Sequence, residues 1–177
     1  MKSNRKSIRV KWDNYQNGSY FITICTYHKR HYFGEISNAE MMLSLLGNKL
    51  NDIIADTIHI RKSQFIEIPI YTIMPNHLHL IITLNTDFDI SQHYFQSNTH
   101  NIGSIVRGIK SALTSFARQH NLDFAWQRGY HDRIIRNPKE FEYIYQYIEN
   151  NVINWQQDCF YPDNPNPRFY LYYVLQS

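Results

Sequence analysis

The sequence predicts an α+β sandwich in which helices cover an antiparallel sheet of about four to five strands. Segments with strand-like and helix-like patterns alternate along the chain in the order β-α-β-β-α-β-α. The second and third strand-like segments are separated only by Pro75-Asn76, which favours a tight antiparallel pair. The 177 residues contain no internal repeat, and this length suits one domain with a buried core. We therefore expect a single domain over residues 1–177.

The composition limits the class of protein. Hydrophobic residues make up 43% and charged residues 19%, which is ordinary for a globular chain. Two cysteines are too few for a disulfide framework, and no apolar run approaches the roughly 20 residues of a membrane span. The basic N-terminus lacks the apolar stretch of a signal peptide. These features predict a soluble cytoplasmic protein.

The first part of the chain is expected to form two strands and a helix. Residues 19–27 are rich in β-branched and aromatic side chains and predict the first strand. Apolar residues follow helical spacing over residues 38–59, with Asn38 as the N-cap. Residues 65–74 predict a second strand, in which Pro69 indicates an edge position or a bulge.

Residues 74–84 predict a strand that carries two histidines. Because alternate side chains of a strand share a face, one face is wholly apolar: Leu78, Leu80, Ile82 and Leu84. His77 and His79 fall on the other face, roughly 6.5–7 Å apart by strand rise, which allows both imidazoles to bind one metal ion. Pro75 and Asn76 mark the strand start, where a site can stay open to substrate. The alternative is two half-exposed histidines on a solvated face.

A polar stretch at residues 85–101 is expected to be a long exposed loop. It is followed by a clean amphipathic helix, whose apolar face consists of Ile102, Ile105, Val106, Ile109, Leu113 and Phe116. The other face carries Arg107, Lys110 and Arg118 with hydroxyl side chains, and no acid occurs between residues 101 and 121. Such a face suits phosphate binding, although solubility alone would also explain it.

The last predicted elements are a strand and a helix. Residues 124–135 predict a strand with a kink at Gly129. Asn137 as N-cap and Pro138 at the first helical position then open a helix. Its buried stripe is expected to be Phe141, Ile144, Ile148 and Val152. The C-terminal segment 155–177 is aromatic and proline-rich, and residues 169–174 form a last strand or pack across the surface.

The N-terminal segment 1–17 is basic and is a second candidate for contact with nucleic acid. Aromatic Trp12 and Tyr15 are interleaved with its cations, so that rings could stack on bases while the cations meet phosphates. The cations are Lys2, Arg5, Lys6, Arg9 and Lys11. A solvated tail is the alternative.

The last helix presents a nucleophile candidate. Tyr143, Tyr147 and Asn151 are four residues apart and share one ridge. We expect Tyr147 to act beside a divalent ion on His77 and His79, with the Asn151 amide oxygen completing the coordination. Mixed nitrogen and oxygen ligands suit Mg²⁺ or Mn²⁺ better than structural zinc. Tyr143 is the nearest rival, but the residue four positions after it is Tyr147 itself and not a polar partner.

These motifs together resemble the single-tyrosine HUH transposases, and within them the REP-associated tyrosine transposases. The His-hydrophobic-His motif, a downstream Tyr-x-x-x-Asn and the intervening Trp-Gln-x-x-Tyr block make the resemblance specific. Matching stretches cover most of the chain: residues 7–11, 18–26, 33–36, 74–80, 126–137 and 147–151.

The resemblance implies a ferredoxin-like HUH fold and a metal-dependent strand transferase acting on single-stranded DNA. By analogy, His77 and His79 hold the ion and Tyr147 attacks a backbone phosphate. The products are a 5′-phosphotyrosine bond and a free 3′-hydroxyl, and rejoining needs no ATP. Asn151 matches the REP-associated branch, since the insertion-sequence branch usually has glutamine there. The family also implies binding to imperfect DNA hairpins (REP-like palindromes), as a monomer or a homodimer.

Other classes of protein fit less well. A histidine-triad hydrolase would need a third alternating histidine, and residue 81 is Ile. A two-histidine phosphodiesterase would need a second His-x-Thr or His-x-Ser motif, which the sequence lacks. The remaining alternative is a domesticated hairpin-binding protein that does not cleave, although such a binder has no need of His77, His79 and Tyr147. If the Tyr147 helix lay on the Leu78 side of the sheet, a second subunit would have to lend the tyrosine.

Overall fold

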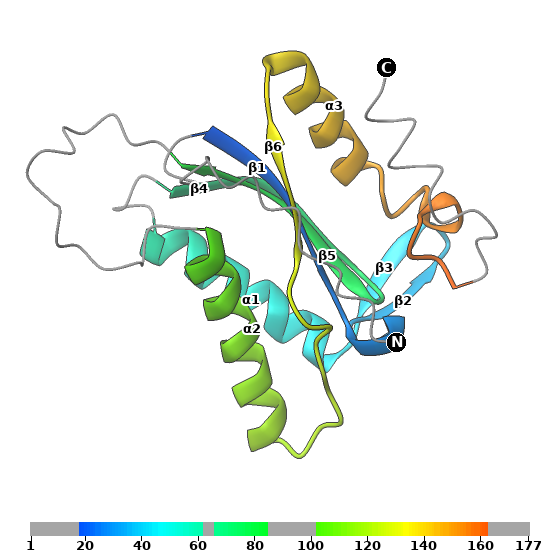
Figure 1. Cartoon of the computed structure of the whole chain (residues 1–177). Coiled ribbons are helices and arrows are strands. Elements are labelled where there is room, and N and C mark those ends of the chain that lie inside the picture. The colour runs from blue at the N-terminus through cyan, green and yellow to red at the C-terminus, as the bar shows by residue number, and fades with distance from the viewer. Residues whose placement is uncertain (1–17, 62–65, 85–101, 163–177) are drawn as a thin grey trace, which may run out of the picture.

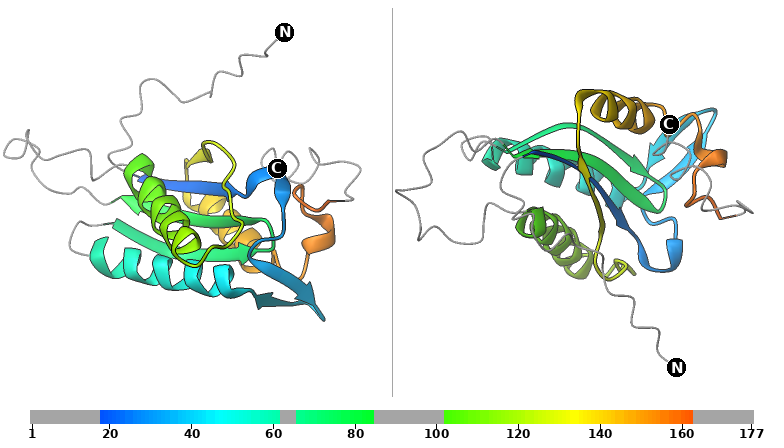
Figure 2. Two further views of the ribbon diagram at one scale, coloured as in Figure 1. Left: turned by 90° about the horizontal axis from the view of Figure 1, so that it is seen from below. Right: turned by 45° about the horizontal axis from the view of Figure 1, so that its top comes forward.

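The computed structural model describes residues 18–61, 66–84 and 102–162 (Figure 1). A four-stranded antiparallel sheet in the order β4-β5-β1-β6 lies between helices α1 and α2 on one face and α3 on the other. Two further views show the same layers (Figure 2). The predicted α+β class and strand number are therefore confirmed.

The central strands are β1 (Gly18–Cys25) and β5 (His77–Leu84), which pair with each other along their whole length. The edge strands are β4 (Ile66–Met74), paired with β5, and β6 (His131–Ile135), paired with β1. The pairing of β4 with β5 shifts register between Glu67 and Ile70. Pro69 lies at this irregularity of an edge strand, so both parts of its predicted position are confirmed.

The helix expected over residues 38–59 begins later than predicted. Residues before it form a hairpin of β2 (Gly34–Ser37) and β3 (Glu40–Leu43). Asn38 is not an N-cap: it lies with Ala39 in the two-residue turn, where both have positive φ of 52° and 61°. Helix α1 spans Leu45–Arg61. Gly47 is required near its start, because a β-carbon there would overlap the carbonyl group of Phe33.

The remaining elements follow the prediction except in one segment. Helix α2 spans Ile102–Gln119, and α3 spans Pro138–Glu149, where the Asn137 side chain accepts a hydrogen bond from the Glu140 amide as the expected N-cap. The strand predicted over residues 124–135 is wrong in its first half. That half makes only an isolated bridge between Trp126 and Thr26, and Gly129 (φ 78°) precedes β6.

Two hydrophobic clusters occupy the two faces of the sheet. The larger cluster contains the alternating apolar residues of β5 from Leu78 to Leu84, packed with buried residues of α1 and α2. The smaller cluster lies under α3 and is formed by Phe21, Ile81, Ile135, Ile144 and Ile148. Because side chains alternate along β5, His77 and His79 share the α3 face with Ile81. The helix that carries Tyr147 therefore packs across the histidine-bearing face, as predicted.

Val152, expected in the buried stripe of the last helix, lies beyond the end of α3 and is only partly buried. Short 3₁₀ turns occur at η1 (Tyr27–Lys29) and η5 (Trp155–Gln157). The predicted loop 85–101, the basic segment 1–17 and the predicted strand 169–174 lie outside the described residues. Within the described residues, no helix is long and apolar enough to cross a membrane.

Candidate active site

His77 and His79 lie at the start of β5 with their rings side by side. Both side chains are fully buried, and their ring centroids are 4.3 Å apart. The half-exposed surface pair considered as an alternative is therefore wrong. The expected open position at the strand entrance is also absent from the described structure, because Phe160 and Trp155 pack against the His77 ring.

Neighbouring side chains orient both imidazoles. His77 Nδ1 lies 2.8 Å from Asn76 Oδ1. The Asn76 amide nitrogen donates to the carbonyls of Lys29 and Phe160, so its oxygen is the acceptor facing His77. His77 therefore carries its proton on Nδ1 and directs the lone pair of Nε2 into the site. On the next histidine, Nδ1 of His79 lies 2.8 Å from Thr23 Oγ1.

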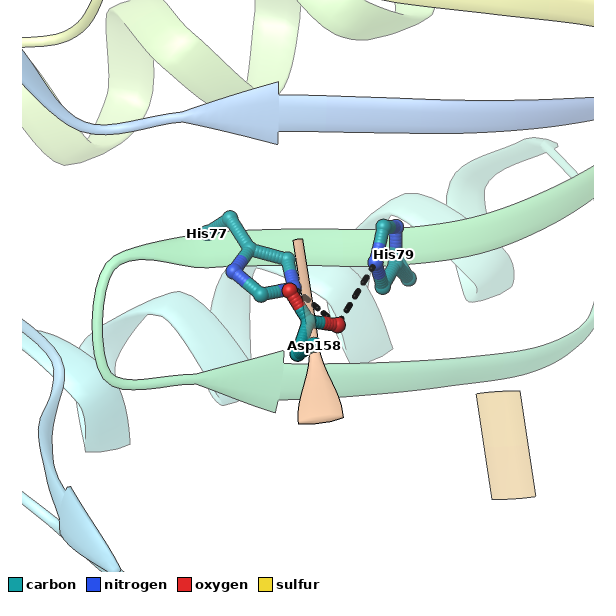
Figure 3. A group of neighbouring side chains, drawn as sticks. All are labelled: His77, His79 and Asp158. Carbon is teal, nitrogen blue, oxygen red and sulfur yellow. Dashed lines mark ion pairs between the residues drawn. The ribbon is translucent and has the colours of Figure 1, made fainter. Parts of the chain in front are cut away.

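Asp158 completes a cluster that the sequence did not predict. Its Oδ2 lies 3.9 Å from His77 Nε2 and 4.0 Å from His79 Nε2, and all three side chains are fully buried (Figure 3). One potential ligand atom from each residue lies within 4.8 Å of the others. Asp158 follows η5 in the aromatic C-terminal segment, and no periodic spacing relates it to the histidines.

Tyr147 of α3 and Asn151 add two further side chains to the cluster, although Asn151 follows the end of the helix and is not on its ridge as predicted. The Tyr147 hydroxyl donates to Asp158 Oδ2 at 3.0 Å and lies 3.3 Å from His79 Nε2. The buried Asn151 amide nitrogen donates to the same Asp158 oxygen at 2.8 Å. The structure thus brings together His77, His79, Tyr147 and Asn151, while their roles remain predictions.

The site fits a cation. In the part of the chain that the structure describes, two buried side-chain atoms have no hydrogen-bond partner: His77 Nε2 and Asn151 Oδ1. Each carries a lone pair, and an unsatisfied buried acceptor costs about 1–3 kcal/mol. A divalent ion between these atoms and Asp158 would satisfy both and would balance the buried carboxylate.

Burial sets the protonation of the site. It lowers the pKa of His77 to about 4. It also lowers the pKa of His79 well below the ordinary value, and the adjacent His77 adds to this effect. Both imidazoles are therefore neutral at pH 7, as metal binding requires. Burial, with the nearby Asp158 carboxylate, raises the pKa of Tyr147 well above its usual value, so the phenol keeps its proton and donates it to Asp158.

The rival nucleophile Tyr143 and two further tyrosines, Tyr145 and Tyr130, lie elsewhere. Tyr143 is on the same ridge but is 38% exposed. Tyr145 packs against the smaller cluster, and Tyr130 packs against the larger one on the opposite face of the sheet. The hydroxyl that reaches the histidines is that of Tyr147.

The basic candidates form a separate surface. Arg107, Lys110 and Arg118 line an open cavity of about 680 Å³ along α2, together with Trp126 and Tyr130. Lys110 Nζ is held at one end by the carbonyls of Gln127 (2.7 Å) and Gly129 (2.9 Å). This surface belongs to the α2 side of the sheet, opposite Tyr147. The predicted DNA contacts Arg5, Lys6, Arg9 and Lys11 lie outside the described residues.

A family model identifies the family of this chain. The family model described as "Transposase IS200 like" matches residues 14–151. An uncharacterized protein of Haemophilus influenzae (strain ATCC 51907 / DSM 11121 / KW20 / Rd) is 41% identical over 171 residues, which cover 90% of this chain and 94% of the relative.

One of two similar solved structures shows the same fold. A REP-associated tyrosine transposase bound to a REP hairpin matches with a TM-score of 0.53 and 21% identity, over 79% of this chain and 69% of that chain. A putative transposase from Deinococcus radiodurans matches with a TM-score of 0.40 and 19% identity, over 85% of this chain and 97% of that chain. With the family model covering most of the chain, the conclusion is direct: the chain belongs to the IS200-like transposase family.

Proposed function

We propose that this transposase-family chain is a metal-dependent strand transferase that nicks and rejoins single-stranded DNA through a covalent bond to Tyr147. The observation that carries the proposal is the position of the Tyr147 hydroxyl, 3.3 Å from His79 Nε2 and 3.0 Å from Asp158 Oδ2. Metal-assisted attack on a phosphodiester requires a nucleophile beside side chains that can bind a metal ion, and Tyr147 lies beside three such buried side chains.

The residues that would hold the ion are His77, His79 and Asp158, with the Asn151 amide oxygen as a fourth ligand. The unpartnered lone pairs of His77 Nε2 and Asn151 Oδ1 support this set. Two nitrogens and two oxygens suit Mn²⁺ or Mg²⁺, and the two imidazoles favour Mn²⁺. When bound, the ion would act as a Lewis acid that stabilises charge developing on the phosphate.

Tyr147 supplies the nucleophile. A cation held by His77, His79 and Asp158 would offset the rise in the pKa of the phenol and would help it to lose its proton. The hydroxyl donates to Asp158 Oδ2 at 3.0 Å, so this carboxylate is placed to take the proton. The phenolate oxygen attacks the backbone phosphorus, and the bond from phosphorus to the 3′-oxygen breaks. The 3′-oxygen takes up a proton and leaves as a hydroxyl, and the 5′-phosphate stays on Tyr147.

Rejoining reverses these steps. A 3′-hydroxyl attacks the phosphotyrosine, its proton is released, and Tyr147 regains a proton as it leaves. The number of phosphate ester bonds is unchanged throughout, so no nucleotide hydrolysis is needed. All proposed groups come from one chain, which supports action by a monomer.

We also propose that the substrate carries a REP-like hairpin. The support is the fold shared with a protein solved on a REP hairpin, together with the basic surface of Arg107, Lys110 and Arg118. Cations with hydroxyl side chains on one helix face suit the phosphate backbone of a hairpin stem. The N-terminal Arg5, Lys6, Arg9 and Lys11 are proposed as additional contacts.

A covalent-adduct assay tests the proposal. End-labelled DNA with a hairpin and a single-stranded flank is incubated with the chain and Mn²⁺, and the products are separated in denaturing gels. We expect a protein–DNA adduct that requires the metal, disappears in Tyr147→Phe and persists in the matched control Tyr143→Phe. An adduct that survives in Tyr147→Phe contradicts the assignment. Tight hairpin binding without any adduct would instead favour the non-cleaving binder.

A further inference from the structure

A second cavity adjoins the Tyr147 centre and has no part in the mechanism above. It measures about 360 Å³ and lies between β1, β6 and the residues that follow Asp158. Aromatic and basic side chains dominate its lining: Phe21, Lys29, His131, Arg133 and Phe160, with Thr23 between them. A volume near the lower end of ligand pockets, about 300–1,000 Å³, suits one unpaired nucleotide rather than a duplex.

The cavity and the Tyr147 centre share a wall. Thr23 lines the cavity and its hydroxyl lies 2.8 Å from His79 Nδ1. The ring of Phe21 is 5.1 Å from the His79 ring and 6.0 Å from the Tyr147 ring, measured between centroids. On the other side, the Phe160 ring is 4.6 Å from the His77 ring. A group in the cavity is therefore one side chain away from the proposed reacting atoms.

The sheet register places two further basic residues on this face. Thr23 of β1 pairs with His79 on one side and with His131 on the other, so the three side chains form one row across the sheet. Phe21 likewise pairs with Arg133. Edge strand β6 thereby extends the histidine-bearing face outward to solvent, where His131 is exposed.

Lys29 places a positive charge beside an aromatic ring of the cavity, whereas the charge of Arg133 is paired with Glu140. Lys29 Nζ lies 5.5 Å from the Phe160 ring centroid and is held by the Cys159 carbonyl at 3.2 Å. Arg133 is oriented by Glu140, with its Nε 2.8 Å from the carboxylate. Asp132 is the one carboxylate among the described residues that line the cavity.

We infer that this cavity is the subsite for the nucleotide next to the scissile phosphate of single-stranded DNA. The base packs against Phe21 and Phe160, and the backbone phosphate is bound by Lys29 and His131, as in other sites where rings and cations alternate. The inferred subsite rests on the proposed function. It names the nucleotide whose binding would position the DNA strand for attack by Tyr147.

A binding measurement tests the subsite independently of cleavage. Tyr147→Phe protein with Mn²⁺ is titrated with fluorescent single-stranded oligonucleotides, each carrying one uncharged methylphosphonate at a different position. We expect one position at which the substitution weakens binding about tenfold, the effect of losing one charge-assisted contact. Lys29→Gln and His131→Gln, each added to Tyr147→Phe, should weaken binding of unmodified DNA and should abolish the extra effect of the methylphosphonate at that position.

Lys139→Ala is the matched control, because Lys139 is an exposed cation outside the cavity. It should leave the position-specific effect intact. Because His131 lies on an exposed edge strand, His131→Gln still tests the phosphate contact if Lys29→Gln disturbs packing. Effects that simply add at every position, or variants that bind like the parent, overturn the inference. If the wild-type chain forms the adduct but the variants leave the methylphosphonate effect unchanged, the subsite alone is refuted. If the variants abolish that effect but no adduct forms, the proposed cleavage alone is refuted.

Discussion

Replacing Asp158 by Asn is expected to remove most of the metal affinity while preserving shape. Asp158 Oδ2 lies 3.9 and 4.0 Å from the two Nε2 atoms, so an ion held by those nitrogens sits close to this carboxylate. A unit charge pair at 4 Å contributes about 4 kcal/mol at an effective dielectric constant of about 20. Allowing for desolvation, we expect a loss of about 3 kcal/mol, or about 100-fold in Kd.

Thermal unfolding measures this loss. After chelation, Mn²⁺ added at about 100 times the wild-type Kd should stabilise the wild-type chain by about 2.7 kcal/mol. For a chain of this size that corresponds to an increase in Tm of roughly 5–11 °C. In Asp158→Asn the same Mn²⁺ concentration is near Kd, and the gain falls to about 0.4 kcal/mol, or roughly 1 °C.

The control is Asp123→Asn, which neutralises a carboxylate whose side chain is 82% exposed and paired with Arg30. Its Mn²⁺-dependent increase in Tm should equal that of the wild type. If Asp158→Asn retained the full increase, Asp158 would not be a ligand, and the proposed coordination set would be refuted.

Three further outcomes are expected. First, because burial lowers the pKa of His77 to about 4, only the unfolded chain binds a proton there below its ordinary value of 6.5. His77 alone should therefore lower the free energy of unfolding of the metal-free chain by about 3 kcal/mol between pH 6.5 and pH 4, and His79, whose pKa is also lowered, adds to this fall. Urea titrations at several pH values measure the dependence, and His77→Gln should reduce it and leave the part due to His79. A wild-type stability independent of pH contradicts the prediction. Second, Ile148→Ala empties a fully buried position under α3 and should cost about 2–5 kcal/mol in urea unfolding, whereas the exposed Ile153→Ala should cost little. Third, Lys110→Gln should weaken hairpin binding for all sequences alike and reduce the slope of log Kd against log salt concentration by about one phosphate contact. An unchanged slope would show that Lys110 does not contact a phosphate.

Local patterns predicted much of the fold, because the relevant physics acts within one element. Alternation along β5 assigned its apolar face, and that face packs against α1 and α2. The pair Asn137-Pro138 located the start of α3, because cap geometry involves only neighbouring residues. The spacing of Tyr147 and Asn151 predicted that their side chains lie together, and both contact Asp158, although α3 ends before Asn151.

Two errors have the same origin in ambiguous local signals. Asn favours both helix caps and tight turns, so Asn38 was compatible with either, and the pairing of β2 with β3 decided for the turn. The aromatic stretch before β6 has strand-like composition, but β1 pairs with β6 only over residues 131–135. A composition that suits a strand forms one only where a neighbouring strand accepts its hydrogen bonds.

The sequence by itself determined the fold class, the histidine pair, the tyrosine four residues before Asn151 and the family they imply. The tertiary structure alone decided that the segment after α3 folds over β5 and buries Asp158 against both imidazoles. It also placed His131 and Arg133 beside the site through the register of β1 and β6. The physical reason is that periodicity relates residues within one helix or strand. Contacts such as Tyr147–His79 and Asp158–His77 arise instead from the packing of segments far apart in the chain.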